Sequence, residues 1–355
     1  MDSKNKIKVL IVDDSALIRQ TLNTIISANK DMEVIASAAD PYVAVNKMKS
    51  EKPDVITLDI QMPRMDGLTF LKKIMLQHPV PVVIISSLTQ KESDLALSAY
   101  KLGAIAVLEK PVMSSELLHK DWIEKLEEAI LTAANSNLTR LKLRKQNTFI
   151  KKEHTAPSSN KPNKVCNNFI LIGSSAGGTE VISEILSMLD TDMPPILIVQ
   201  HMPVEFTASY AQRLNDNSKL NVREAVSGDE LSRGIALIAP GDKHMELNNN
   251  GFNFFVKLNS EQKVNRHRPS VDVLFASALK YTSINILAII LSGMGNDGSS
   301  GMLRLKETGA ITVVQNRETS IVYGMPKEAL KIGAADYSLS TSDIVKAINK
   351  FSKRP

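Results

Sequence analysis

The sequence has little of what secreted, membrane-spanning and cysteine-ligated proteins need. Its 355 residues include one cysteine, Cys166, too few for an internal disulfide or for the thiolates of a metal cluster. No apolar run approaches the roughly 18–20 residues that span a bilayer. The opening residues MDSKNKIKVLIVDD are polar and then strand-like, unlike a secretory signal peptide. We therefore expect a cytoplasmic protein without membrane insertion.

The excess of positive charge is confined to one segment. The chain has a net charge of +5, yet residues 135–168 contain eight Lys or Arg against one acid, Glu153, which leaves the rest of the chain at −2. That segment is rich in Asn, Ser, Lys and Pro and offers only Phe149 for base stacking. Its composition favours a flexible linker between two domains, and we expect no nucleic-acid partner.

Residues 1–134 alternate strand and helix patterns. Short apolar runs such as KIKVLIV and VPVVIIS alternate with amphipathic stretches such as GLTFLKKIML, and together they predict five βα units. This alternation is typical of a doubly wound α/β fold with a parallel sheet, in which functional groups gather at the carboxyl ends of the strands.

Five polar residues follow the predicted strands of this first domain. Asp13 and Asp14 follow the first strand, Asp59 the third, Ser86 the fourth and Lys110 the fifth. Crowded carboxylates require a cation, so we expect a hard divalent ion such as Mg²⁺ beside Lys110. Asp59 is then placed to accept a phosphoryl group, with Ser86 following it. The alternative, that these aspartates only cap helices or turns, does not explain the pattern on successive strands.

With its motifs VDDS, LDIQMPRMDG and EKP, this domain resembles a response-regulator receiver domain of flavodoxin-like fold. The resemblance implies that Asp59 is the phosphorylation site, that Asp13, Asp14 and Asp59 bind Mg²⁺, and that Ser86 and Lys110 sense the phosphoryl group. One position departs from the family pattern, because Val107 stands where many receivers have an aromatic switch residue.

The stretch FILIGSSAGG, residues 169–178, organises the second domain. Four apolar residues predict a buried strand, the small residues after them predict a tight turn, and TEVISEILSML has the period of a helix. This geometry presents a serine at the sheet edge, beside helix N–H groups that stabilise negative charge. We therefore interpret Ser175 as a nucleophile. A turn capped by Ser174 or Ser175 remains the alternative.

A serine nucleophile needs a base, and three histidines of this domain are candidates. His201 directly follows the apolar run ILIVQ and is favoured, because it emerges at the same sheet edge as Ser175. His244, in the predicted loop PGDKHMEL after another strand, is second. His267 lies between Arg266 and Arg268, whose charges disfavour the imidazolium that a base must become.

The orienting acid is predicted in LSGMGNDG, which follows the apolar run ILAIILS. Asp297 leaves that strand, and the N–H of Met294 can join those of the Ser175 turn in an oxyanion hole. The same glycines, Gly293, Gly295 and Gly298, spell a dinucleotide fingerprint, with Glu318 twenty residues on. That alternative is disfavoured because Asp297 would face a pyrophosphate, and because too little chain follows.

The motifs GSSAGGTE, VQHMP, APGDKHMEL, VNRHRPSVDVLF, LSGMGNDG and YGMP resemble the catalytic domain of the chemotaxis protein-glutamate methylesterase (CheB) family. The resemblance implies a Ser175–His201–Asp297 triad, oxyanion donors at Ala176 and Met294, and no cofactor in this domain. It also implies methyl-accepting receptors as substrates and a chemotaxis histidine kinase as phosphodonor. Ala176 departs from the threonine usual in the family.

The whole sequence thus predicts two doubly wound α/β domains joined by a linker. A receiver covers residues 1–134, the flexible linker 135–168, and a Rossmann-like esterase domain 169–355, with an antiparallel insertion near FNFFVKL. The predicted function is a phosphorylation-activated methylesterase that also deamidates glutamine. Arg266 and Arg268 are candidate contacts for acidic receptor surfaces, and the alternative for these two residues is that both are solvated surface arginines. The alternative is a response regulator whose output domain only binds a protein partner.

Overall fold

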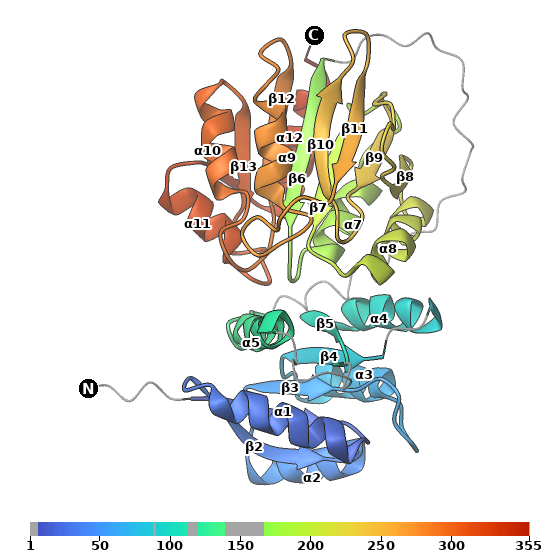
Figure 1. Cartoon of the computed structure of the whole chain (residues 1–355), viewed down its shortest axis with the longest axis vertical. Coiled ribbons are helices and arrows are strands. Elements are labelled where there is room, and N and C mark those ends of the chain that lie inside the picture. Colours follow the sequence, from blue (N-terminus) through green and yellow to red (C-terminus); the bar gives the residue numbers. More distant parts are fainter. Residues whose placement is uncertain (1–5, 88–89, 112–119, 139–166, 355) are drawn as a thin grey trace. The chain divides into compact units, whose positions relative to one another are not determined.

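The computed structural model describes residues 6–87, 90–111, 120–138 and 167–354 (Figure 1). The chain divides into two compact units, Met1–Gln146 and Asn147–Pro355. Most of the segment predicted as a linker, including Cys166, lies outside the described residues. None of the helices in the described ranges is both long enough and apolar enough to cross a bilayer.

The first unit is a five-stranded parallel sheet with the strand order β2-β1-β3-β4-β5. Its strands are β1 (Ile7–Val12), β2 (Met32–Ala38), β3 (Val55–Leu58), β4 (Val82–Ser86) and β5 (Ala106–Glu109). The helices are α1 (Ala16–Ala28), α2 (Pro41–Ser50), α3 (Gly67–Gln77), α4 (Gln90–Leu102) and α5 (Lys120–Ala134). Side chains of Ser15, Asp40 and Asp66 cap α1, α2 and α3. This order confirms the flavodoxin-like fold expected from the sequence.

The second unit is a seven-stranded parallel sheet with the order β14-β13-β12-β6-β7-β9-β8 (Figure 1). Its strands are β6 (Asn168–Ser174), β7 (Ile196–Gln200), β8 (Asn221–Glu224), β9 (Ile235–Ile238), β12 (Asn285–Ile290), β13 (Ile311–Gln315) and β14 (Tyr337–Leu339). The helices are α7 (Thr179–Ser187), α8 (Val204–Asp216), α9 (Val271–Ala278), α10 (Ser299–Glu307), α11 (Met325–Lys331) and α12 (Thr341–Phe351). Every residue of β6 and β7 is buried, as expected for central strands with apolar runs.

The antiparallel insertion is a separate hairpin of β10 (His244–Asn249) and β11 (Phe254–Asn259). Its buried Met245, Leu247 and Val256 join α9 in the core that covers one face of the large sheet. The sequence interpretation was wrong in one detail, because His244 does not lie in a loop but begins β10. It also overlooked β8 and β14, the two edge strands of the sheet, and the helices α11 and α12.

Both sheets have a point at which the strand order reverses. In the first unit this point lies between β1 and β3, and in the second between β6 and β12. Connections leave these neighbouring strands in opposite directions, so the loops after them part and leave a crevice. The loops after these four strands, β1, β3, β6 and β12, contain most of the residues that the sequence predicts to be functional, namely Asp13, Asp14, Asp59, Ser175, Ala176, Met294 and Asp297. Ser86, Lys110 and His201 lie at the ends of β4, β5 and β7.

Candidate active site

The turn after β6 holds Ser175 in a partly buried position at the reversal point. The Ser175 N–H donates to the Ser292 carbonyl at 3.0 Å, which ties the turn to the loop after β12. Gly177 has φ 73°, a left-handed conformation that glycine adopts without strain. The serines do not cap α7, because its N-cap is Gly178 without a side-chain bond and the Ser174 hydroxyl donates to the Ser292 carbonyl. The Ser175 hydroxyl is therefore not used to build the turn.

His201 lies beside Ser175 because β6 and β7 are neighbours in register. Ser174 pairs with Gln200, so the next residue of each strand emerges at the same edge. Adjacent parallel strands are about 4.8 Å apart. The His201 N–H donates to the Ser174 carbonyl at 3.0 Å, and the buried Gln200 amide donates to the carbonyls of both Ser175 and His201. Gln200, which the sequence reasoning overlooked, thus holds the two backbones together.

Asp297 is almost completely buried, 1% exposed, and accepts several hydrogen bonds. Its donors are the His201 ring at 2.9 Å, the Ser270 hydroxyl at 2.7 Å, the Val271 N–H at 2.7 Å and the Asn265 amide at 2.8 Å. Burial alone would raise the pKa of Asp297, but the bonds from His201, Asn265 and Ser270 outweigh it and hold the pKa below its usual range. The carboxylate is therefore ionised and anchored.

The ionised Asp297 fixes the tautomer of His201. A carboxylate can only accept, so the proton between the two groups belongs to Nε2 of the ring. In the neutral ring Nδ1 then has a lone pair, and among the residues that the structure describes it is buried without a hydrogen-bond partner. Nδ1 is thus the nitrogen available to act as a base, although no bond joins it to Ser175 in this structure. Such bonds are often open in free enzymes and tighten around the substrate.

The loop after β12 lies directly against the Ser175 turn. A Cβ atom on Gly293 would approach Ser175 Cβ to 2.9 Å and Met325 Sδ to 2.3 Å, so only glycine allows this contact. Met294 follows Gly293 and is thereby brought to the nucleophile. The Ala176 carbonyl accepts from the Ser292 hydroxyl at 2.9 Å, which fixes the turn on which the Ala176 N–H lies.

The buried Asp297 also argues against a dinucleotide at the GxGxxG motif. Its carboxylate fills the loop that would have to surround a pyrophosphate, and the negative charge would repel the ligand.

The two other candidate histidines of this domain, His244 and His267, have contacts of their own. His244 is buried and structural, since Nε2 contacts the Gln262 carbonyl and Nδ1 accepts from the Ser270 N–H. His267 stacks on His201, a contact that the sequence did not predict.

The two arginines beside His267 differ in their surroundings. Arg268 donates to Asp242 and to the carbonyls of Ser260 and Glu261, so its guanidinium is engaged within the domain. Arg266 is exposed. Of the two predicted contacts for an acidic surface, Arg266 alone is presented to solvent.

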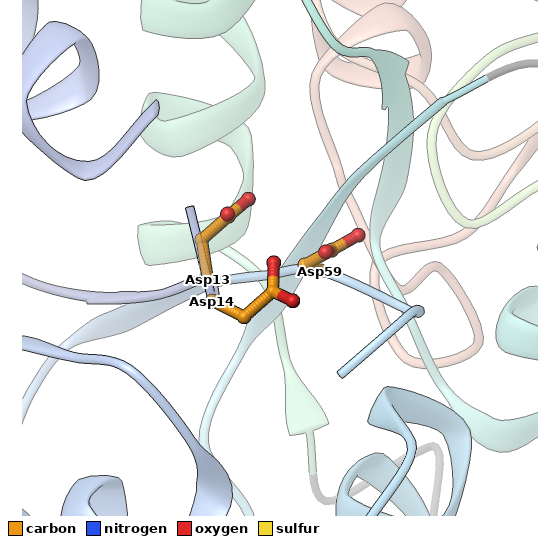
Figure 2. Close-up of side chains that lie close together, drawn as sticks. All are labelled: Asp13, Asp14 and Asp59. Carbon is orange, nitrogen blue, oxygen red and sulfur yellow. The ribbon is translucent and has the colours of Figure 1, made fainter. Parts of the chain in front are cut away.

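A second cluster lies at the reversal point of the first sheet. Figure 2 shows the carboxyl groups of Asp13, Asp14 and Asp59 gathered where β1 and β3 end, and their ligand atoms lie within 4.8 Å of one another. Lys110 Nζ lies 2.8 Å from Asp59 Oδ2. It is also 2.9 Å from Asp13 Oδ2, an ionic contact outside hydrogen-bond geometry. Acidic clusters of this kind are typical magnesium sites of receiver domains.

The charges of this cluster are only partly balanced. Burial raises the pKa of Asp59 to about 6, and Lys110 opposes this rise without cancelling it. Burial also works to lower the pKa of Lys110, but the contacts with Asp59 and Asp13 hold it above its ordinary value. The hydroxyl of Ser86 is buried at the end of β4 and has no hydrogen-bond partner within the described part of the chain. The excess of negative charge is suited to binding a cation, and the Ser86 hydroxyl is suited to donating to a phosphoryl group.

Val107, where many receivers have an aromatic residue, is buried in β5. Its N–H donates to the hydroxyl of Tyr100 at 3.2 Å, so the aromatic ring at this side of the sheet comes from α4 instead.

The raised pKa of Asp59 predicts a pH-dependent cost in stability. Between pH 4 and 6 the folded receiver retains a proton that the unfolded chain has lost, so its stability falls as the pH rises. Without divalent cations we expect the wild type to lose on the order of 3 kcal/mol over this range relative to Asp59→Asn. Urea unfolding in EDTA, followed by fluorescence of the single tryptophan, Trp122 of α5, measures this difference. An equal pH dependence of both proteins would contradict it.

Comparison with known proteins adds to this geometry. The family model described as CheB methylesterase matches residues 170–348, and that of the response regulator receiver domain matches residues 9–120. A protein-glutamate methylesterase/protein-glutamine glutaminase of Oleidesulfovibrio alaskensis is 45% identical over 348 residues, 97% of this chain and 98% of that protein.

The chain belongs to the CheB family. A second relative with the same name, from Geobacter metallireducens, is 42% identical and is also covered over 98% of its length. Among solved structures, the CheB methylesterase catalytic domain of Thermotoga maritima is 39% identical, with a TM-score of 0.51. It covers 52% of this chain, and 99% of its own length is matched. The family expected from the sequence motifs is therefore confirmed, and its order of a receiver followed by a CheB domain holds here.

Proposed function

We propose that this protein hydrolyses glutamate γ-methyl esters of chemoreceptors, and deamidates receptor glutamines, with Ser175, His201 and Asp297 as a catalytic triad. One observation supports this most strongly, the buried His201–Asp297 pair that leaves Nδ1 without a partner among the described residues, at the end of the strand next to the one that Ser175 follows. The relatives that match over nearly their full length have both activities in their names.

In the proposed reaction the Ser175 oxygen attacks the ester carbonyl while Nδ1 of His201 takes the hydroxyl proton. The backbone N–H groups of Ala176 and Met294 stabilise the oxyanion. The imidazolium, bonded through Nε2 to Asp297, then returns its proton to the departing methoxide, and methanol leaves. Water, activated by the same nitrogen, attacks the acyl-enzyme and releases the glutamate carboxylate.

The same groups account for deamidation. An amide carbonyl is attacked in the same way, and Nδ1 of His201 gives its proton to the leaving nitrogen, so that ammonia departs instead of methanol. Because both substrates yield the same glutamyl ester of Ser175, one site serves both reactions.

Release of methanol from methylated receptor membranes tests this function. The wild-type protein should release methanol, and a small phosphodonor should increase the rate. A response regulator whose second domain only binds a partner would release none while still binding, and this outcome would favour that alternative.

We also propose that Asp59 is phosphorylated with Mg²⁺ bound at Asp13, Asp14 and Asp59. When bound, the metal supplies positive charge that offsets the carboxylates and the phosphoryl oxygens. Lys110 provides a further cation at the same carboxylate, and the Ser86 hydroxyl, for which the described ranges hold no partner, can donate to a phosphoryl oxygen. The phosphodonor is a chemotaxis histidine kinase, and the reactions take place in the cytoplasm.

Asp59→Asn should therefore leave the basal release of methanol unchanged and remove its stimulation by phosphodonor, since asparagine cannot accept the phosphoryl group. Initial rates with and without acetyl phosphate measure this. Asp31→Asn is the matched control, because Asp31 is exposed and precedes β2 at the opposite edge of the sheet, and it should respond as the wild type does. Stimulation that persists in Asp59→Asn would place the switch at another residue.

A further inference from the structure

The ring of His201 has two contacts, a hydrogen bond at one edge and a stacked ring on one face. Asp297 contacts the edge at Nε2, 2.9 Å away. The ring of His267 covers a face, with 3.7 Å between ring centroids and 13° between ring planes. Two nearly parallel rings at this distance are in full van der Waals contact. The His201 side chain is consequently only 8% exposed although it lies at the sheet edge.

The backbone that presents His267 is built for this position. Asn265 and Arg266 both have left-handed φ values, 51° and 69°, a conformation rare in residues other than glycine. Val264 and His267 exchange backbone hydrogen bonds of 2.9 and 3.1 Å across this turn. Such conformations persist only where surrounding contacts enforce them, and they gather at functional sites.

Contacts on both sides of His267 fix the turn further. Before it, the Asn265 amide bonds both Asp297 and Asp272. After it, Arg268 is anchored at Asp242. The segment that anchors the proposed acid of the triad thus also places a ring on the proposed base.

We propose that His267 is a positioning residue for the base. Stacking holds the plane of the His201 ring so that Nε2 stays on Asp297 and Nδ1 stays directed to Ser175. Without the stacked ring, rotation of the imidazole would break the Nε2 bond and move Nδ1 away from the hydroxyl. This inference rests on the proposed function, because it concerns the orientation of the same base.

Two variants of His267 separate stacking from the chemistry of the imidazole. His267→Phe keeps a flat ring without nitrogen atoms, and His267→Ala removes the ring. If stacking is the function, kcat for methanol release should fall roughly ten- to a hundredfold in His267→Ala, with KM unchanged, since small displacements of a catalytic group have such effects. His267→Phe should stay within about threefold of the wild type.

A spectroscopic measurement tests the same orientation without turnover. In the full-length protein labelled with ¹⁵N-histidine, the Nε2 proton of His201 should be protected from exchange, and His201→Gln identifies its signal. The signal should persist in His267→Phe and be weakened or lost in His267→Ala. This measurement also reports the ring orientation in a variant whose activity cannot be assayed. Thermal unfolding checks that both variants fold.

The inference is overturned if His267→Ala has wild-type kcat, if His267→Phe loses as much activity as His267→Ala, or if only KM changes. The last outcome would make His267 a substrate contact. It is also overturned if the His201 signal is the same in all three proteins. A wild-type protein that releases no methanol would instead reject the proposed function, and the NMR comparison would still decide the orientation of the ring.

Discussion

Ser175→Ala should lower methanol release by roughly 10⁵-fold or more, because the variant retains the base and the oxyanion donors but has no atom to form the acyl-enzyme. Deamidation should fall by the same factor, since both reactions pass through that ester. Receptor binding should not change, because the hydroxyl forms no bond on which the turn depends. Initial rates on methylated receptor membranes, with thermal unfolding as a check on folding, measure this loss.

The chain provides a matched control one residue away. Ser174 is fully buried, and its hydroxyl donates to the Ser292 carbonyl rather than facing the site. Ser174→Ala should therefore reduce the rate modestly, by the effect of one lost internal hydrogen bond on the turn. A larger loss in Ser174→Ala than in Ser175→Ala would show that the nucleophile has been assigned to the wrong serine.

Asp297→Asn should lower kcat by roughly 10³- to 10⁴-fold. The amide cannot accept bonds through both of its terminal atoms, so its NH₂ group would face a donor among His201, Ser270 and the Val271 N–H. The asparagine side chain would also no longer keep the proton of His201 on Nε2. The ring could then present a protonated Nδ1, which cannot act as a base, to Ser175. KM should change little, because Asp297 is buried away from the substrate.

Asp336→Asn provides the control for that substitution. Asp336 also accepts hydrogen bonds, from Thr312 at the amino-terminal end of β13, but it has no link to the triad. Its replacement should affect thermal stability and not kcat. If Asp297→Asn retained more than a tenth of the wild-type kcat, His201 would not depend on this carboxylate and the triad would be rejected.

The sequence could predict the fold and the strand ends because both depend on local pattern. Ser175, His201 and Asp297 each follow an apolar run, and parallel strands bring such positions to one edge whatever their separation in the chain. The same reasoning placed Asp13, Asp14 and Asp59 together at the first sheet. Short polar elements gave no such signal, and β8, with the sequence NVRE, lacks the apolar run by which a buried strand is found.

The shell around the triad could not be predicted, because it depends on backbone turns. His267 was disfavoured as a base because arginines flank it in the sequence. In the structure the left-handed residues Asn265 and Arg266 redirect the chain, so the His267 ring contacts His201 while Arg268 turns to Asp242. The arginines that flank His267 in the sequence therefore do not both place their charge beside its ring. Gln200 was missed for a related reason, since a polar residue ending an apolar strand gives no indication of what its amide will bond.

The identity of the residue that becomes acylated decides whether Ser175 is the nucleophile. A methylated receptor fragment is mixed with the enzyme, quenched in acid within a turnover, and digested, and the mass of the peptide containing Ser174 and Ser175 is measured. We expect a glutamyl ester on Ser175 that forms with the release of methanol and is absent from Ser175→Ala. Acylation of another residue, or methanol released by Ser175→Ala at the wild-type rate, would contradict it.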